Sequence, residues 1–129
     1  MSAYFFERII EGSFDDVEQR ITSALKEQGF GILTEINVQG VFKNKLDIDF
    51  RPYKILGACN PNFAHQAISA EPNIGVFLPC SVVIQGLDNG RIKIAAVDPV
   101  ASMMSVENAK LGELAGAVQT RIKKAVEAA

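Results

Sequence analysis

Residues 74–85, I-G-V-F-L-P-C-S-V-V-I-Q, form the longest nearly continuous apolar run in the chain. A run rich in Val, Ile and Phe and bounded by turn-forming residues predicts a strand buried on both faces. Pro79 interrupts it, because proline has no backbone N–H to donate to a neighbouring strand. The sequence therefore predicts two strand segments, 74–78 and 80–86, separated by a bulge that re-aims Cys80.

Length and composition indicate a globular protein. The 129 residues are 48% hydrophobic and 22% charged, with a formal net charge of -2. A chain of this size buries roughly two-thirds of its unfolded surface, which suffices for one domain without a disulfide or metal staple. The absence of a basic stripe argues against nucleic-acid binding, and no apolar run approaches the ~20 residues that cross a membrane. We expect a single-domain cytoplasmic protein whose two cysteines stay reduced.

The N-terminal part of the chain predicts a strand, a helix and a second strand. Aromatic and β-branched residues over 3–10 suit a partly exposed strand. Apolar residues then recur at helical spacing over 13–28, with Ser13 as the N-cap and Gly29 just past the end. A second strand is expected over 30–36.

The central part contains one ambiguous segment. Residues 38–50 fit a short helix and a period-two strand equally well, so periodicity does not decide between them. A third strand is expected over 53–59. Asn60 then suits the N-cap of a short helix, which Glu71 and Pro72 would stop.

The C-terminal part predicts a hairpin and a long helix. The turn at 88–90 should pair the strand over 80–86 with one over 91–97 in antiparallel fashion. A loop follows through Met104, and apolar spacing over 111–126 predicts the last helix. Together these elements predict an α+β domain whose antiparallel sheet carries its helices mainly on one face.

Three sequence blocks resemble a known family. They are Y-K-I-L-G-A-C-N-P at 53–61, E-P-N-I-G-V-F-L-P-C-S-V-V-I at 71–84 and A-V-D-P at 96–99. Their order is similar to that of the bacterial and archaeal domain of unknown function 302, over essentially the whole chain, although Ser81 stands where many members carry asparagine. The resemblance implies a β-α-β core of the TATA-box-binding-protein-like kind and favours a helix over 38–46. It implies no activity, because the family has none assigned.

Four residues are the candidates for a ligand site. Cys59 precedes the helix start at Asn60, where backbone amides and the helix dipole lower the pKa of a thiol. Cys80 follows the proline, and His65, the only histidine, lies one turn into the helix and could act as a base. The sequence favours a plainer interpretation for each: packed core cysteines and a half-exposed structural histidine. If a site exists, we expect it where Cys59, Asn60 and Cys80 converge, with His65 at its rim.

Motifs for other chemistry are absent from the sequence. The cysteines and the histidine lack the spacing of a metal site, and no nucleotide-binding or hydrolase motif is present, so we expect no cofactor. Two classes of function remain: a small-ligand or protein-binding accessory domain, which we favour, and a thiol-dependent enzyme or sulfur/redox carrier using Cys80 or Cys59. The apolar composition and the interrupted run with Phe77 also predict a homodimer.

Overall fold

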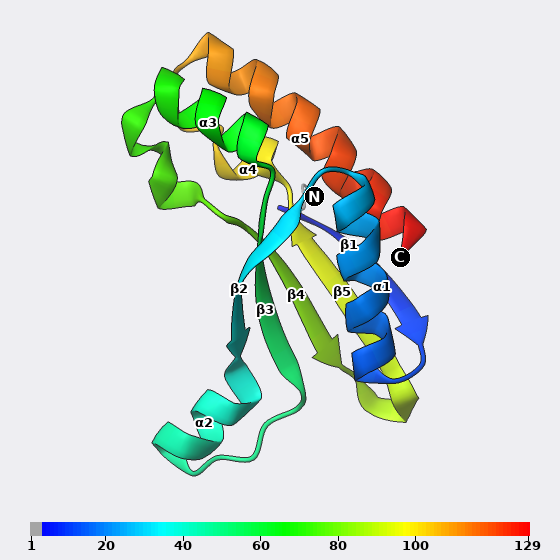
Figure 1. The fold of residues 1–129 in the computed structure, drawn as a ribbon. Helices are drawn as coiled ribbons and strands as arrows, with labels where there is room; N and C mark the ends of the chain where they lie inside the picture. The colour runs from blue at the N-terminus through cyan, green and yellow to red at the C-terminus, as the bar shows by residue number, and fades with distance from the viewer. Residues whose placement is uncertain (1–3) are drawn as a thin grey trace.

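A five-stranded antiparallel sheet in the order β1-β5-β4-β3-β2 forms the centre of the structure (Figure 1). The structure, a computed structural model, describes residues 4–129. The strands are β1 (Phe5–Glu11), β2 (Gly31–Asn37), β3 (Tyr53–Cys59), β4 (Cys80–Gly86) and β5 (Arg91–Val97). The α-helices are α1 (Phe14–Glu27), α2 (Val38–Leu46), α3 (Pro61–Ala70), α4 (Pro99–Ser102) and α5 (Ala109–Ala128), and the 3-10 helices are η1 (Pro72–Phe77) and η2 (Asp88–Gly90).

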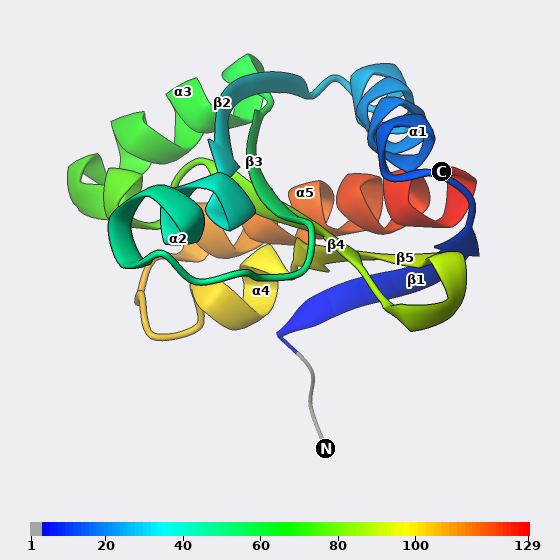
Figure 2. The same cartoon turned by 90° about the horizontal axis from the view of Figure 1, so that it is seen from below.

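Helices α1 and α5 lie on the same side of the sheet and build the core with it (Figure 2). The strands supply alternate residues to this face, as the two-residue period of a strand requires. In β4 these are Val82 and Ile84, both fully buried. Val17, Ile21 and Leu25 of α1 and Ile122 of α5 meet them from the helical side. The predicted α+β fold, with its helices mainly on one face, is confirmed.

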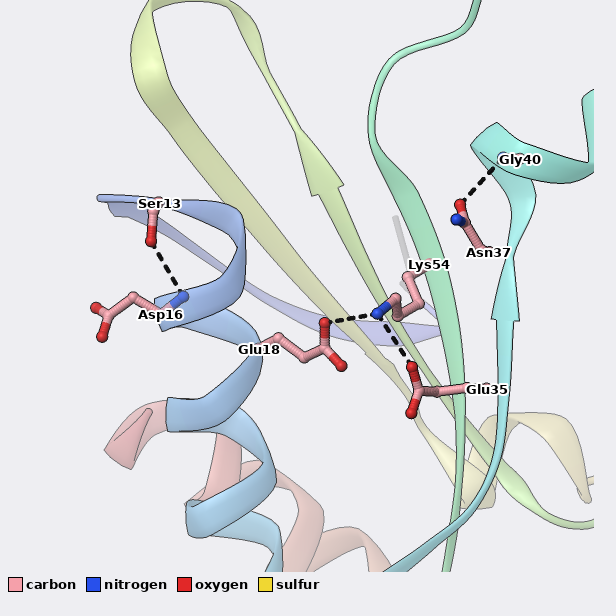
Figure 3. Close-up of polar contacts among 7 residues, drawn as sticks. All are labelled: Ser13, Asp16, Glu18, Glu35, Asn37, Gly40 and Lys54. Carbon is pink, nitrogen blue, oxygen red and sulfur yellow. Dashed lines mark hydrogen bonds and ion pairs between the residues drawn. The ribbon is translucent and has the colours of Figure 1, made fainter. Parts of the chain in front are cut away.

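Local capping defines where the helices begin. The Ser13 hydroxyl accepts a hydrogen bond from the Asp16 amide at 3.1 Å, and the Asn37 side chain does the same for Gly40 at 3.1 Å (Figure 3). Each bond satisfies one of the first-turn amides that have no partner within the helix. The segment that periodicity left open is therefore a helix over its first nine residues, as the family resemblance indicated.

An ion-pair cluster ties α1 to the edge of the sheet. Lys54 of β3 lies 2.8 Å from Glu18 of α1 and 3.0 Å from Glu35 of β2 (Figure 3). The hydrogen bond to Glu18 raises the pKa of Lys54, partial burial opposes it, and Glu35 adds a further rise. The ammonium therefore stays charged at neutral pH and joins three elements.

The prediction of a strand over 74–78 is wrong. Residues 72–77 form η1, in which Ile74 is buried but Val76 is 81% exposed and Phe77 is 41% exposed. Pro72 starts this helix at a position where its missing N–H costs nothing. An apolar run alone does not distinguish a short helix from a buried strand. Here the run contains the end of η1 and most of β4.

The predicted bulge at Pro79 is also wrong. Pro79, which follows a cis peptide bond, precedes β4, and β4 pairs with β3 without a register shift. A proline just outside a strand leaves the ladder intact, because no bond of the ladder needs its nitrogen. The expected loop after β5 contains the short helix α4. The proposed strand over 3–10 includes Ala3, which lies outside the described residues.

The packing of α5 gives a test of the core. Replacing Ile122 by Ala should lower the free energy of unfolding by about 2–4 kcal/mol, because the side chain is fully buried between α5 and the sheet. Urea denaturation followed by circular dichroism measures this difference. The neighbouring Lys123→Ala, at an exposed position, should change it by less than about 0.5 kcal/mol. Equal effects of the two changes would show that α5 is not docked as described.

Candidate functional site

An apolar cavity lies at the end of the sheet where α3 and α5 meet β3 and β4. Residues 58–60 at the end of β3 and 78–80 at the start of β4 form one side of it. Helices α3 and α5 form the other, and they pack against each other above this end of the sheet (Figure 1). Pro99 of α4 and Met103 after it complete the lining. We call this space the α3–α5 cavity.

Small side chains leave this space open. Four alanines line the cavity, namely Ala58, Ala64, Ala67 and Ala115, and its volume is about 40 Å³. One water molecule needs roughly 10–15 Å³ of such volume and two or more polar partners. The remaining lining is almost wholly apolar, with Phe30, Phe63 and Leu111 among its largest members. The cavity therefore favours an apolar occupant over water.

Cys80 presents a protonated thiol to this cavity. It is the first residue of β4, pairs with Ala58 across the sheet and is 7% exposed. Burial, with a smaller contribution from nearby Cys59, raises its pKa to about 11. Because the thiolate is the nucleophilic form, Cys80 is a weak nucleophile at neutral pH.

Cys59 and Asn60 line the same cavity from the end of β3. Cys59 is half-buried and forms no disulfide. The Asn60 side chain accepts a hydrogen bond from the Phe63 amide at 3.4 Å, so Asn60 is the N-cap of α3 as expected. This bond engages one of the free amides at the helix start. The three residues therefore combine two thiols and one amide group in an otherwise apolar wall.

Gly57 determines how closely the segment before β4 approaches β3. A Cβ atom at this position would lie 2.7 Å from Cγ of Pro79 and 2.2 Å from Oγ1 of Thr34. Both distances are shorter than real contacts allow, and the proline ring cannot rotate away. The missing side chain at Gly57 thus lets Pro79 sit against β3, which places Cys80 at the cavity.

His65 does not join the other three residues. It is exposed on α3 and is absent from the cavity lining. Within residues 4–129, no three His, Cys, Asp or Glu side chains are grouped as metal ligands. The lining also includes residues of α5 that the sequence did not single out as ligand contacts. Their apolar spacing at the helical period indicates only that they belong to the core. No sequence pattern indicates the space that the alanines leave open.

The fold and the site define a class: an α+β domain with a small apolar cavity at one end of an antiparallel sheet and two thiols in its lining. The chain belongs to the family described as domain of unknown function DUF302, whose model matches residues 6–129. A solved structure, the uncharacterized conserved protein DUF302 from Bacillus stearothermophilus, is similar to it with 26% identity and a TM-score of 0.89, over 98% of each chain. No curated protein matches the chain.

The environments of the two thiols give a second test. Iodoacetamide at neutral pH should label half-buried Cys59 first and Cys80 slowly, and Cys80 labelling should speed up as the pH approaches 11. Gly57→Ala should lower the free energy of unfolding by roughly 1–3 kcal/mol and accelerate Cys80 labelling, because Pro79 must move. Mass spectrometry of peptides measures both rates.

Gly31→Ala provides the matched control, since a Cβ at Gly31 of β2 meets nothing within 4 Å. It should change neither the stability nor the labelling of Cys80. Labelling of Cys80 as fast as that of Cys59 in the unaltered protein would show that the Cys80 thiol is not buried.

Proposed function

We propose that this domain binds a small apolar molecule, or the apolar end of a larger one, in the α3–α5 cavity. The single observation that carries the proposal is an apolar cavity of about 40 Å³, larger than one water requires but with few polar partners for water. Ligand sites in proteins usually combine such a wall with a few polar groups that orient the ligand. Here Cys59, Asn60 and Cys80 would be those groups.

The size of the cavity limits the ligand. A volume of 40 Å³ is below the ~300–1,000 Å³ of sites for drug-sized molecules, so a short alkyl group is the expected occupant. Met103 in the lining has three rotatable side-chain bonds and would let the cavity adapt to a somewhat larger group. His65 is exposed, so we do not propose it as a ligand contact.

Xenon is the probe that tests this proposal, because it enters dry apolar cavities of proteins. Under xenon pressure, methyl signals of the cavity lining should shift in a saturable way in two-dimensional NMR spectra. Ala64→Leu, which adds a side chain at the half-buried wall, should abolish the shifts. Ala117→Leu, on the exposed side of α5, should leave them unchanged. Saturable shifts that persist in Ala64→Leu, or no shifts in the unaltered protein, would refute the proposal.

The second candidate function is thiol chemistry, in an enzyme or a sulfur or redox carrier. The observation in its favour is that Cys59 and Cys80 line one cavity. The raised pKa of Cys80 opposes a nucleophilic role for that residue, so Cys59 would have to carry it. The labelling experiment above distinguishes the two thiols. Rapid labelling of Cys59 that falls on Asn60→Ala would favour this candidate.

We also propose that the domain works as a homodimer in the cytoplasm. Ile68, Val76 and Phe77 are exposed apolar residues on α3 and η1 and would offer a symmetric contact. The two free cysteines are compatible with a reducing compartment. None of the helices that the structure describes has the length and hydropathy to span a bilayer.

Sedimentation velocity tests the dimer. At about 50 µM, a concentration at which interfaces of standard size persist, the protein should sediment as a dimer and Val76→Ser/Phe77→Ser as a monomer. The double change should not unfold the protein, since Val76 is 81% exposed and Phe77 lies at the surface with 41% exposed. A monomer in the unaltered protein would refute the proposal.

A further inference from the structure

The face of the sheet opposite α1 and α5 carries a groove unrelated to the α3–α5 cavity. On this face Ala95 of β5 lies at the centre, with Val83 of β4 and Glu7 of β1 as its neighbours in the ladder. Lys93 and Val97 flank it along β5. Because the Ala95 side chain is short and its neighbours are longer, the middle of the face is depressed.

This depression, which we call the open-face groove, has a volume of about 330 Å³. That volume lies within the ~300–1,000 Å³ typical of small-molecule sites. The lining includes Tyr53 from β3 and Phe5 from β1, with Val83 and Ala95 between these strands. The groove therefore has an apolar floor on β4 and β5, and the strands on either side of this floor, β1 and β3, each contribute an aromatic ring.

A guanidinium without a carboxylate partner lies beside the groove. Arg51 stacks on Phe50, with Cζ 4.4 Å from the ring centroid, and lies 5.8 Å from the Tyr53 centroid. Its Nε donates to the Gln85 side chain at 3.0 Å, and both Gln85 and Tyr53 line the groove. No ion pair joins Arg51 to an acidic residue within residues 4–129. Its two terminal nitrogens are therefore held in place while remaining free to donate.

The other cation of the groove is already engaged. Lys93 lies 2.8 Å from Glu7, and its ammonium is 5.8 Å from the centroid of the Phe5 ring. Among the lining residues that the structure describes, Lys93 is the only charged one. The carboxylate of Glu7, which borders the groove beside Ala95, is engaged by Lys93, so the free charge that would attract an anion is that of Arg51.

We propose that the open-face groove is a second binding site, and that its ligand is an aromatic carboxylate. The ring would lie over Ala95 between Tyr53 and Phe5, where flat aromatic surfaces pack against each other. The carboxylate would take two parallel hydrogen bonds from Arg51, the geometry that a guanidinium fork matches best. This proposal does not depend on the α3–α5 cavity, which lies on the helical side of the sheet.

2-Naphthoate is the probe, and its neutral analogue 2-naphthylmethanol is the comparison. Isothermal titration calorimetry should show naphthoate binding more tightly than the alcohol. Arg51→Gln should weaken naphthoate about tenfold and leave the alcohol unchanged, because only the acid uses the guanidinium. Ala95→Leu should weaken both ligands by filling the groove, and Ala117→Leu should affect neither.

The tyrosines locate the bound ring. The chain has two tyrosines, Tyr4 and Tyr53, and both line this groove. Their ring-proton NMR signals should therefore shift on addition of naphthoate, and Ala64→Leu should not alter the affinity. Weaker naphthoate binding in Ala64→Leu would place the ligand in the α3–α5 cavity and overturn the proposal.

Two further results would also overturn it. Equal affinity for the acid and the alcohol, or unchanged naphthoate binding in Arg51→Gln, would show that Arg51 selects no carboxylate. Conversion of a dimer into a monomer by Ala95→Leu, measured by sedimentation, would assign this face to a contact between two copies of the chain.

Discussion

The close approach of Pro79 to Gly57 is the constraint on which the site end of the molecule depends. Only a residue without a side chain leaves room for the proline ring against β3, as the 2.7 Å distance from a Cβ at position 57 demonstrates. The approach brings the chain from the exposed helix η1 directly into β4. Cys80 thereby becomes a buried strand residue that faces the α3–α5 cavity, and the cavity gains a wall from the start of β4.

The one-sided arrangement of helices gives the two faces of the sheet different chemistry. The face under α1 and α5 is packed with aliphatic side chains, and the space left at its end is small and apolar. The opposite face keeps aromatic rings and cations at the surface, around a depression at Ala95. The two sites that we propose therefore lie on separate faces, with the sheet itself between them.

The sequence predicted most of the fold because each element carries a local signal. Helices α1, α3 and α5 have polar N-caps and apolar stripes, and the hairpin before β5 has its turn residues. The prediction of a strand over 74–78 is wrong because a continuous apolar run has no period that separates a short helix from a strand. Pro79 within an apolar run likewise suggests an interruption inside a strand, whereas in the structure it lies just before the strand begins.

The candidate site was only partly accessible to the same reasoning. Cys59, Asn60 and Cys80 lie at element boundaries that the sequence reveals, and the structure places all three on one cavity. The alanines of α3 and α5 that leave the space, and Ala95 on the open face, become informative only when distant strands and helices are side by side. A small residue predicts a cavity only when the residues that surround it in the fold are known.

Helix α2 has a consequence for the dynamics of the molecule. It projects from the end of the sheet away from α3 and has no buried residue (Figure 1). The contacts that hold it include the ring of Phe42 against Phe50 and a 3.0 Å bond from Gln39 to the Phe50 carbonyl. Such a segment opens at little free-energy cost while the core stays closed. Its amide hydrogens should therefore exchange with solvent through local opening, whereas those of α5 and the central strands should exchange only when the whole domain unfolds.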